Sequence, residues 1–254
     1  MTAIAGWLIV TELPGWLERD GQAQPVATPS AEPTVPADPD ALPEVRPIDY
    51  RTFADPTGLA FTGAALHSGA AIQLTDGANQ AGGVWSANSL DPARPFSTAF
   101  RFTSTERSGQ VSFVLRTGGI VDDRPVERLV PRLTIDFVIS ATRDGGTDRN
   151  ANTVLVTSAT SSGSRTLGTT QPALDLGGGP ITVWVDYSAK QQKIRVYASA
   201  GTAKPADPII TAPLKLNALL GTNPAYAGFA ASTREVAGGH DLLAWHLSPP
   251  TGRP

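Results

Sequence analysis

From Ile48 onward, apolar and polar residues alternate in short segments separated by clusters of Gly, Asp, Asn and Pro. The segments are rich in Val, Ile, Thr, Phe and Trp, which is typical of β-strands, and the clusters are typical of turns. The predicted strands are residues 70–75, 83–86, 96–103, 111–116, 133–140, 153–158, 181–187, 193–198, 226–232 and 242–247.

The segment 133–140 shows the alternation most clearly. Every second side chain is apolar, as expected for a strand with one buried face; these residues are Leu133, Ile135, Phe137 and Ile139. The opposite face carries Thr134, Asp136, Val138 and Ser140. Helical periodicity is confined to 216–220, which a glycine follows. We therefore predict an all-β fold, an antiparallel sandwich of about ten strands.

Two segments precede the predicted sandwich. Residues 1–21 are apolar in their first half and are compatible with a truncated signal or anchor, or with an ordinary amphipathic start. Residues 22–47 contain seven prolines and no aromatic residue or glycine, a composition typical of an extended spacer. The predicted layout is thus an N-terminal segment (1–21), a Pro-rich linker (22–47) and a sandwich (48–250).

Composition excludes several classes of protein. The 254 residues include no cysteine, so disulfides, thiolate catalysis and cysteine-type zinc sites are ruled out. The net charge of −3 and the scattered basic residues do not fit a nucleic-acid-binding protein. No apolar run approaches the roughly 20 residues that a membrane-spanning helix needs.

Three segments, in this order along the chain, resemble L-type (legume-type) lectins. They are LTDGANQAGGVWSANSLDPARPFSTAFRF (74–102), VWVDYSAKQQKIRVYAS (183–199) and GFAASTREVAGGHDLLAWHLS (228–248). The resemblance implies a concanavalin-like jelly roll of two packed sheets. It also implies that glycans bind at one end of the sandwich, next to a calcium ion and a transition metal.

The family's metal ligands are only partly matched. The resemblance places its Glu-x-Asp pair on Asp136 and Val138, its loop Asp on Thr147 or Asp148, and its His on Asn152. Calcium requires several oxygen ligands, and valine supplies none. The candidate metal ligands are therefore Asp136, Asp148 and Asn152, in a degenerate site.

The family's sugar-binding positions are also altered. Its Asp falls on Ser108 or Gly109, and its Gly-rich loop on Gly118 and Gly119. The resemblance adds the loop around Arg234, which sets sugar preference in the lectins. Separately, the oxygen-rich segment 144–152 is either a long strand connection or a remodelled calcium or ligand loop that contains Asp144, Asp148, Asn150 and Asn152. The candidate carbohydrate-binding residues are Ser108, Gly109, Gly118, Gly119, Asn150 and Arg234.

Other interpretations of single residues are less favoured. Trp85, Trp184 and Trp245 are expected to pack in the core or on a sheet face, with Trp184 the best candidate for stacking on a sugar. His240 is expected to be structural, and no Gly-x-Ser-x-Gly motif accompanies it. A glycosidase needs two suitably spaced carboxylates, which the strand around Asp136 lacks.

The sequence therefore predicts a non-catalytic carbohydrate-binding module of an exported or cell-surface protein, with glycans as its ligands. An alternative is a structural or adhesive sandwich that binds protein or has no small ligand. The oligomeric state stays open. A glycan array run with calcium and again with a chelator separates these functions. Binding that the chelator abolishes supports the lectin site, and no binding in either condition favours the second function.

Overall fold

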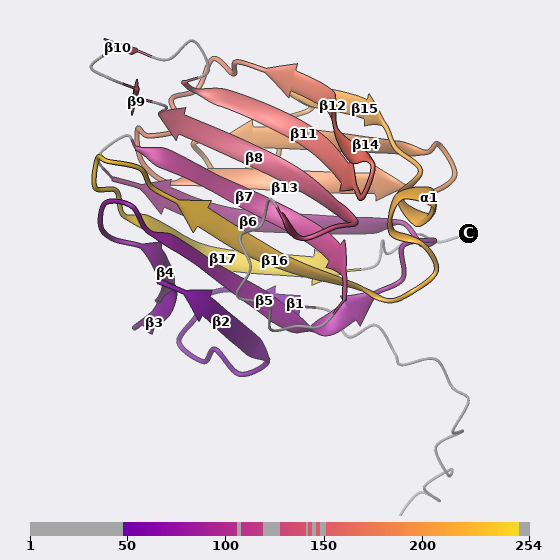
Figure 1. Ribbon diagram of the computed structural model, residues 1–254, viewed down its shortest axis with the longest axis horizontal. Coiled ribbons are helices and arrows are strands. Elements are labelled where there is room, and N and C mark those ends of the chain that lie inside the picture. Colours follow the sequence, from indigo (N-terminus) through magenta and orange to yellow (C-terminus); the bar gives the residue numbers. More distant parts are fainter. Residues whose placement is uncertain are drawn as a thin grey trace, which may run out of the picture. The chain divides into compact units, whose positions relative to one another are not determined.

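The computed structural model describes residues 48–105, 108–118, 128–140, 142–143, 146–147 and 151–248. In these ranges the chain forms two antiparallel sheets packed face to face (Figure 1). The predicted all-β sandwich is therefore confirmed. The N-terminal segment and the Pro-rich linker lie outside the described residues. None of the described helices is long and apolar enough to cross a membrane.

One sheet has eight strands. In spatial order it contains β15 (Ile210–Pro213), β14 (Lys193–Ser199), β13 (Ile181–Ser188), β6 (Phe96–Ser104), β17 (His240–Ser248), β4 (Ala71–Thr75) and β3 (Leu66–Ser68). The eighth strand, β1 (Ile48–Tyr50), pairs with the end of β17. The last strand in the sequence thus lies in the interior of this sheet.

The other sheet has seven strands. In spatial order it contains β12 (Gly163–Thr170), β11 (Thr153–Thr160), β8 (Arg132–Ser140), β7 (Gly109–Thr117), β16 (Ala225–Ser232), β5 (Ala81–Leu90) and β2 (Leu59–Gly63). A separate two-stranded ribbon pairs β9 (Thr142–Arg143) with β10 (Gly146–Thr147). The helix α1 (Leu216–Leu220) ends before Gly221, as predicted.

The core fills the space between the two sheets. Strict alternation on β6 and β13 turns every second side chain inward, where it is buried. Aromatic rings from both sheets meet at the centre, where Phe100 of β6 stacks on Phe113 of β7 and meets Phe229 of β16 edge to face. The predicted apolar face of 133–140 is buried as expected.

Three neighbouring strands of one sheet are each joined by a loop to one of three neighbouring strands of the other sheet, in the same spatial order. The order β6-β17-β4 in one sheet is matched by β7-β16-β5 in the other. Because β4 leads to β5, β6 to β7 and β16 to β17, three short loops cross between the sheets at one end of the sandwich (Figure 1). The described residues of these loops are 76–80, Thr105, Ser108 and 233–239. We call them the crossover rim.

Candidate functional site

The first and third loops of the crossover rim are joined by hydrogen bonds. The amide of Asn79 donates to the carbonyl of Arg234 over 2.7 Å. The hydroxyl of Thr233 accepts from the amide of Gln80 (3.0 Å) and donates to the carbonyl of Gly77 (2.6 Å). Thr233 is buried, so one side chain satisfies two backbone groups that water cannot reach. These bonds fix the two loops against each other.

The second loop is held by the same segment 233–239. The amide of Thr105 donates to the carbonyl of Gly239 (2.8 Å), and the amide of Gly239 donates to the hydroxyl of Thr105 (3.0 Å). The hydroxyl of Ser108 donates to the carbonyl of Val236 (2.8 Å). The segment 233–239 therefore binds both other loops and forms the centre of the rim.

A buried histidine lies beneath this rim. His240 is fully buried at the start of β17, and its Nδ1 lies 2.6 Å from the hydroxyl of Thr75. That hydroxyl donates its single proton to the carbonyl of Gly238, so Nδ1 of His240 is the donor in the shared bond. Burial lowers the pKa of His240 to about 4, against a smaller opposing effect of a hydrogen bond with the Ser108 backbone. The ring is therefore neutral near pH 7 and serves as a structural donor, as the sequence predicted.

The lowered pKa of His240 predicts a pH dependence of stability. An unfolded chain binds this proton near pH 6.5, whereas the folded chain takes it up only near pH 4. As pH falls through this window, the unfolded state binds more protons, so the free energy of unfolding should decrease. The full contribution is about 3 kcal/mol. Urea unfolding at pH 7, 6, 5 and 4.5 measures it.

A matched variant isolates the histidine from other titrating groups. Asn at position 240 can keep a donor near Nδ1 but carries no titrating ring. The His240→Asn protein should be less stable than wild type at pH 7, and its stability should fall less steeply between pH 6.5 and 4.5. Equal slopes for the two proteins would contradict the assignment of this pH dependence to His240.

The structure brings three of the predicted sugar-binding residues to the crossover rim. Ser108 is buried there, Gly109 starts β7 directly after it, and the side chain of Arg234 is exposed. Gly118 follows the opposite end of β7, roughly 30 Å from Gly109 at a rise of about 3.3 Å per residue. The structure therefore does not bring Gly118 to this rim. Gly119 and Asn150 lie outside the described residues.

The two predicted metal ligands that the structure describes, Asp136 and Asn152, already hydrogen-bond to other groups of the protein. Asp136 lies on the outward face of β8, where it accepts hydrogen bonds from the hydroxyls of Ser112 (2.6 Å) and Thr134 (2.9 Å). The side chain of Asn152 accepts from the amide of Leu176 and donates to two carbonyls of the segment 172–174. Asp148 lies outside the described residues.

These residues do not fit a calcium ion. Calcium takes six to eight oxygen ligands, usually with several carboxylates among them. Next to Asp136 on the same face of β8 is Val138, and Asn152 uses both ends of its amide to hold the segment 172–176. Among the described residues, no group of three or more His, Asp or Glu side chains could hold a metal. We therefore derive no function through a metal.

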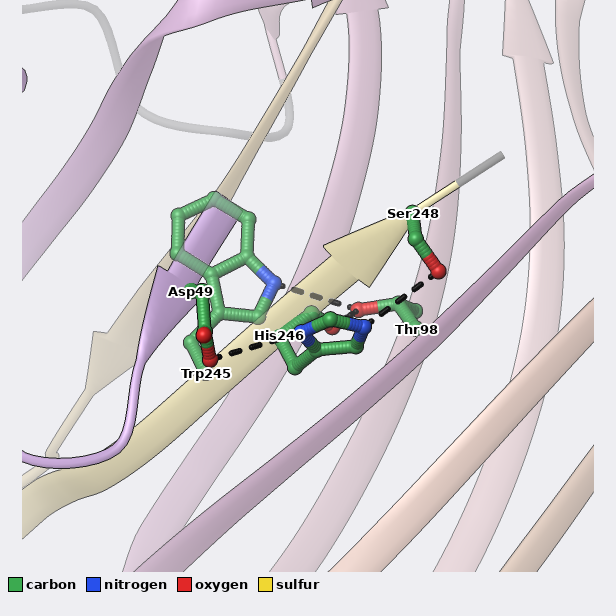
Figure 2. A network of polar contacts seen from close by, with 5 residues as sticks. All are labelled: Asp49, Thr98, Trp245, His246 and Ser248. Carbon is green, nitrogen blue, oxygen red and sulfur yellow. Dashed lines mark hydrogen bonds and ion pairs between the residues drawn. The ribbon is translucent and has the colours of Figure 1, made fainter. Parts of the chain in front are cut away.

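The tryptophans lie where packing was expected. Trp245 is buried between the sheets, and its Nε1 donates to Thr98 (Figure 2). Trp85 is buried on the outward face of the seven-stranded sheet, against Leu129 and beneath the guanidinium of Arg116. Trp184 is half-buried on the outward face of the eight-stranded sheet. None of the three belongs to the crossover rim.

Sequence reasoning missed Thr233, which joins two of the rim loops. The signal for it is weak, because a threonine next to a strand end resembles any turn residue. Its importance follows from strand order in both sheets, which a local pattern does not contain. Thr75 was missed for the same reason.

The segment 133–252 matches the legume lectin domain family. The resemblance to L-type lectin domains is confirmed. Curated relatives include the L-type lectin-domain containing receptor kinase S.7 of rice, which is 39% identical over 77 residues, or 30% of this chain and 11% of that protein. The probable receptor kinase I.2 of Arabidopsis thaliana is 29% identical over 120 residues, or 45% of this chain and 18% of that protein.

The chain therefore spans between 9% and 18% of the length of the curated relatives that it matches. Solved lectins match the fold over most of this chain. Lectin I-B4 of Griffonia simplicifolia, in a metal-free form, has a TM-score of 0.61 at 15% identity, covering 80% of this chain and 98% of that one.

The lumenal domain of VIP36, solved with calcium and a Man3GlcNAc glycan, has a TM-score of 0.62 at 14% identity, covering 81% of this chain and 90% of that one. The described residues thus have a lectin-type fold, and the segment 133–252 matches the legume lectin domain family, which is consistent with carbohydrate binding.

Proposed function

We propose that this lectin-type domain is a non-catalytic carbohydrate-binding module whose ligand binds at the crossover rim. The observation that carries the proposal is the hydrogen-bonded assembly of three loops around the segment 233–239. A rigid rim limits the conformational entropy that is lost when a flexible, polar ligand binds.

The exposed side chains of the rim suit a ligand rich in hydroxyl groups. Asp76, Asn79, Arg234 and Glu235 are exposed at the loops' surface. Carboxylate oxygens accept hydrogen bonds from sugar hydroxyls, guanidinium groups donate to them, and an amide does both. Such groups, fixed on one rim, can read the pattern of hydroxyls around a sugar ring.

The proposed binding does not depend on calcium. Asp136 already accepts two hydroxyl hydrogen bonds, and Val138 adds no oxygen beside it. Asn152 stabilises the neighbouring segment 172–176 instead of a cation. In the proposed module, the side chains of Asp136 and Asn152 therefore hold the polar network on β8 and the segment 172–176.

The proposed module has no hydrolytic role. A glycosidase places two carboxyl groups about 5–5.5 Å or 6.5–9.5 Å apart across the scissile bond. On the outward face of β8, the neighbours of Asp136 are Thr134 and Val138, and neither carries an acid. Lectin families are in general non-catalytic, which supports the same conclusion.

The domain layout belongs to the same proposal. Residues 1–21 and 22–47 are proposed to be an N-terminal lead segment and a Pro-rich spacer ahead of a sandwich over 48–250. We propose an extracellular or cell-surface location for this sandwich. A spacer of this kind holds a binding module away from a surface, because Pro-rich chains stay extended.

A glycan array tests the proposed function. Wild-type protein should bind one or more neutral glycans, and EDTA should leave the signal unchanged. Arg234→Ala should lower affinity by about tenfold or more, as expected when a charged hydrogen bond is lost. Arg165→Ala is the matched control, because Arg165 is an exposed arginine on the edge strand β12 and should bind normally.

The outcomes separate the parts of the proposal. Loss of binding in EDTA would contradict calcium independence but leave glycan binding standing. Normal binding by Arg234→Ala would remove this residue from the site. Silence toward every glycan would overturn the proposed function and favour the structural or adhesive alternative.

A further inference from the structure

The outward face of the eight-stranded sheet carries a compact set of side chains that the crossover rim does not use. On β13 and β6, residues with half-buried side chains alternate with fully buried ones. Register places Trp184 of β13 opposite Ala99 of β6, and Thr182 of β13 opposite Arg101 of β6. Trp184 and Arg101 are therefore diagonal neighbours on one face.

Arg101 makes no hydrogen bond or ion pair within the described part of the chain, and its Nε is closed off from water. The hydroxyl of Thr182, directly opposite, is likewise closed off and without a partner among the described residues. A buried donor without an acceptor destabilises the folded chain, and more strongly when the donor is charged. Two such atoms side by side mark an incomplete polar network.

The other polar side chains near Arg101 have partners of their own. Lys204 pairs with Asp186, which also accepts from Ser97, and the Lys204 ammonium lies over the ring of Tyr197. Arg195, on the same face, donates to the side chain of Gln191. None of these groups neutralises Arg101.

His246 and Asp241 do not neutralise it either. Figure 2 shows His246 of β17 between Asp49 of β1 and Ser248, with its two ring nitrogens directed at these partners. Asp241 lies diagonal to Arg101, but the two form no ion pair. Burial, and then the charge of Asp76, raises the pKa of the Asp241 carboxyl. Among the described residues of this face, Arg101 is thus a cation whose buried Nε has no polar partner.

The residues beside Arg101 along and across the strands are small, except for Trp184. Its neighbour across the strand pair on β17 is Ala244, and Ala99 lies two positions along β6. Both are small, whereas Trp184 presents a large flat ring beside Ala99. A flat ring, a guanidinium and small neighbours together suit a ring-shaped ligand that carries one negative group.

We propose that this face binds a sugar bearing a carboxylate, a uronic acid residue of a glycan, at Arg101, Thr182 and Trp184. The carboxylate accepts hydrogen bonds from the guanidinium, which turns outward and uncovers the Thr182 hydroxyl as a further donor. The sugar ring stacks on the indole of Trp184. This second site does not depend on binding at the crossover rim.

The surrounding hydroxyl groups favour a sugar over an acidic peptide. The same face carries further hydroxyl side chains, at Ser97, Thr103, Ser199 and Ser248. These groups can both donate to and accept from sugar hydroxyls. An acidic peptide would gain the carboxylate contact but carries few groups that both donate to and accept from these hydroxyls.

Calorimetric titration of the full chain with trigalacturonate tests the proposal, alongside a neutral trisaccharide and an acetylated Asp-Gly-Asp peptide. Trigalacturonate should bind, and Arg101→Gln should weaken it at least tenfold. Trp184→Leu should also weaken it. Arg195→Gln removes one positive charge from the same face and should change affinity less than about twofold.

Stability and the choice of probe keep the outcomes distinct. Arg101→Gln should melt at or above the wild-type temperature, because no partner is lost. If Arg101→Gln does not fold, Arg101→Lys replaces it, because lysine keeps the charge but lacks the planar guanidinium. No binding of trigalacturonate, equal affinity for Arg101→Gln and wild type, or binding of the peptide instead would each overturn the proposal. The affinity for a glycan whose binding depends on Arg234 should be unchanged in Arg101→Gln. The two proposed sites can therefore be tested separately.

Discussion

Phe100→Ala is expected to lower the free energy of unfolding by about 3–5 kcal/mol, the range for truncating a buried aromatic side chain. Phe100 is 1% exposed, and its ring lies 5.7 Å from Phe113 and 4.8 Å from Phe229. These two rings come from the opposite sheet, so the substitution opens a cavity between the two layers. Urea denaturation followed by tryptophan fluorescence gives the change in stability.

An exposed leucine controls for the loss of apolar surface alone. Leu66 lies on the edge strand β3 and is 46% exposed. Leu66→Ala should therefore change stability by less than about 0.5 kcal/mol. A loss below about 1 kcal/mol for Phe100→Ala would contradict a core centred on the aromatic rings.

Gly109→Ala is expected to destabilise the domain by about 4 kcal/mol. The φ angle of Gly109 is +78°, a conformation that costs other residues roughly 1–3 kcal/mol. An added Cβ would also lie 2.1 Å from the carbonyl oxygen of Ser232 on the paired strand β16. Relieving that overlap requires two central strands to separate, at a further cost of about 1–3 kcal/mol. Thermal and urea unfolding measure the combined loss.

Gly118→Ala separates the two causes. Gly118 also has a positive φ, +104°, but the nearest atom to an added Cβ is a guanidinium nitrogen of Arg116 at 3.6 Å. Only the backbone strain applies there, so the loss should be about 1–2 kcal/mol. Similar losses for the two variants would mean that the contact between β7 and β16 at the rim is looser than described.

The interior strands could be predicted from the sequence, because burial of one face imposes alternation. All ten predicted segments coincide with strands, apart from residue 70, which is in a turn, and the short helix is also where it was predicted. The edge strand β12 was missed, because its side chains are mostly exposed and its sequence GSRTLGTT has no apolar alternation. The other missed strands have two to five residues, β2 and β15 among them, and are too short to show a clear period.

The candidate site could be predicted only in part, because it depends on strand order. Ser108 and Arg234 are 126 positions apart, and resemblance to the lectins was needed to place them together. The pairing of β6, β17 and β4 across from β7, β16 and β5, which brings their loops to one rim, leaves no local signature. For the same reason, the sequence did not show that Gly118 follows the far end of β7.

The unpaired charge of Arg101 was equally invisible in the sequence. An arginine on an alternating strand usually faces solvent and finds a carboxylate or water. Here the register with β13 places it opposite a threonine and diagonal to a tryptophan. Only the cross-strand neighbours, together with the ion pairs of the described residues, show that Arg101 pairs with no carboxylate there.

The central claim is that the crossover rim is the carbohydrate-binding surface of this lectin-type domain. Amide chemical-shift mapping with a neutral glycan selected on the array tests it most directly. We predict that the largest shifts fall in the segments 76–80 and 233–239 and at Thr105, Ser108 and Gly109, in the presence of EDTA. Shifts confined to the outward faces of the sheets, with the three loops unchanged, would contradict it.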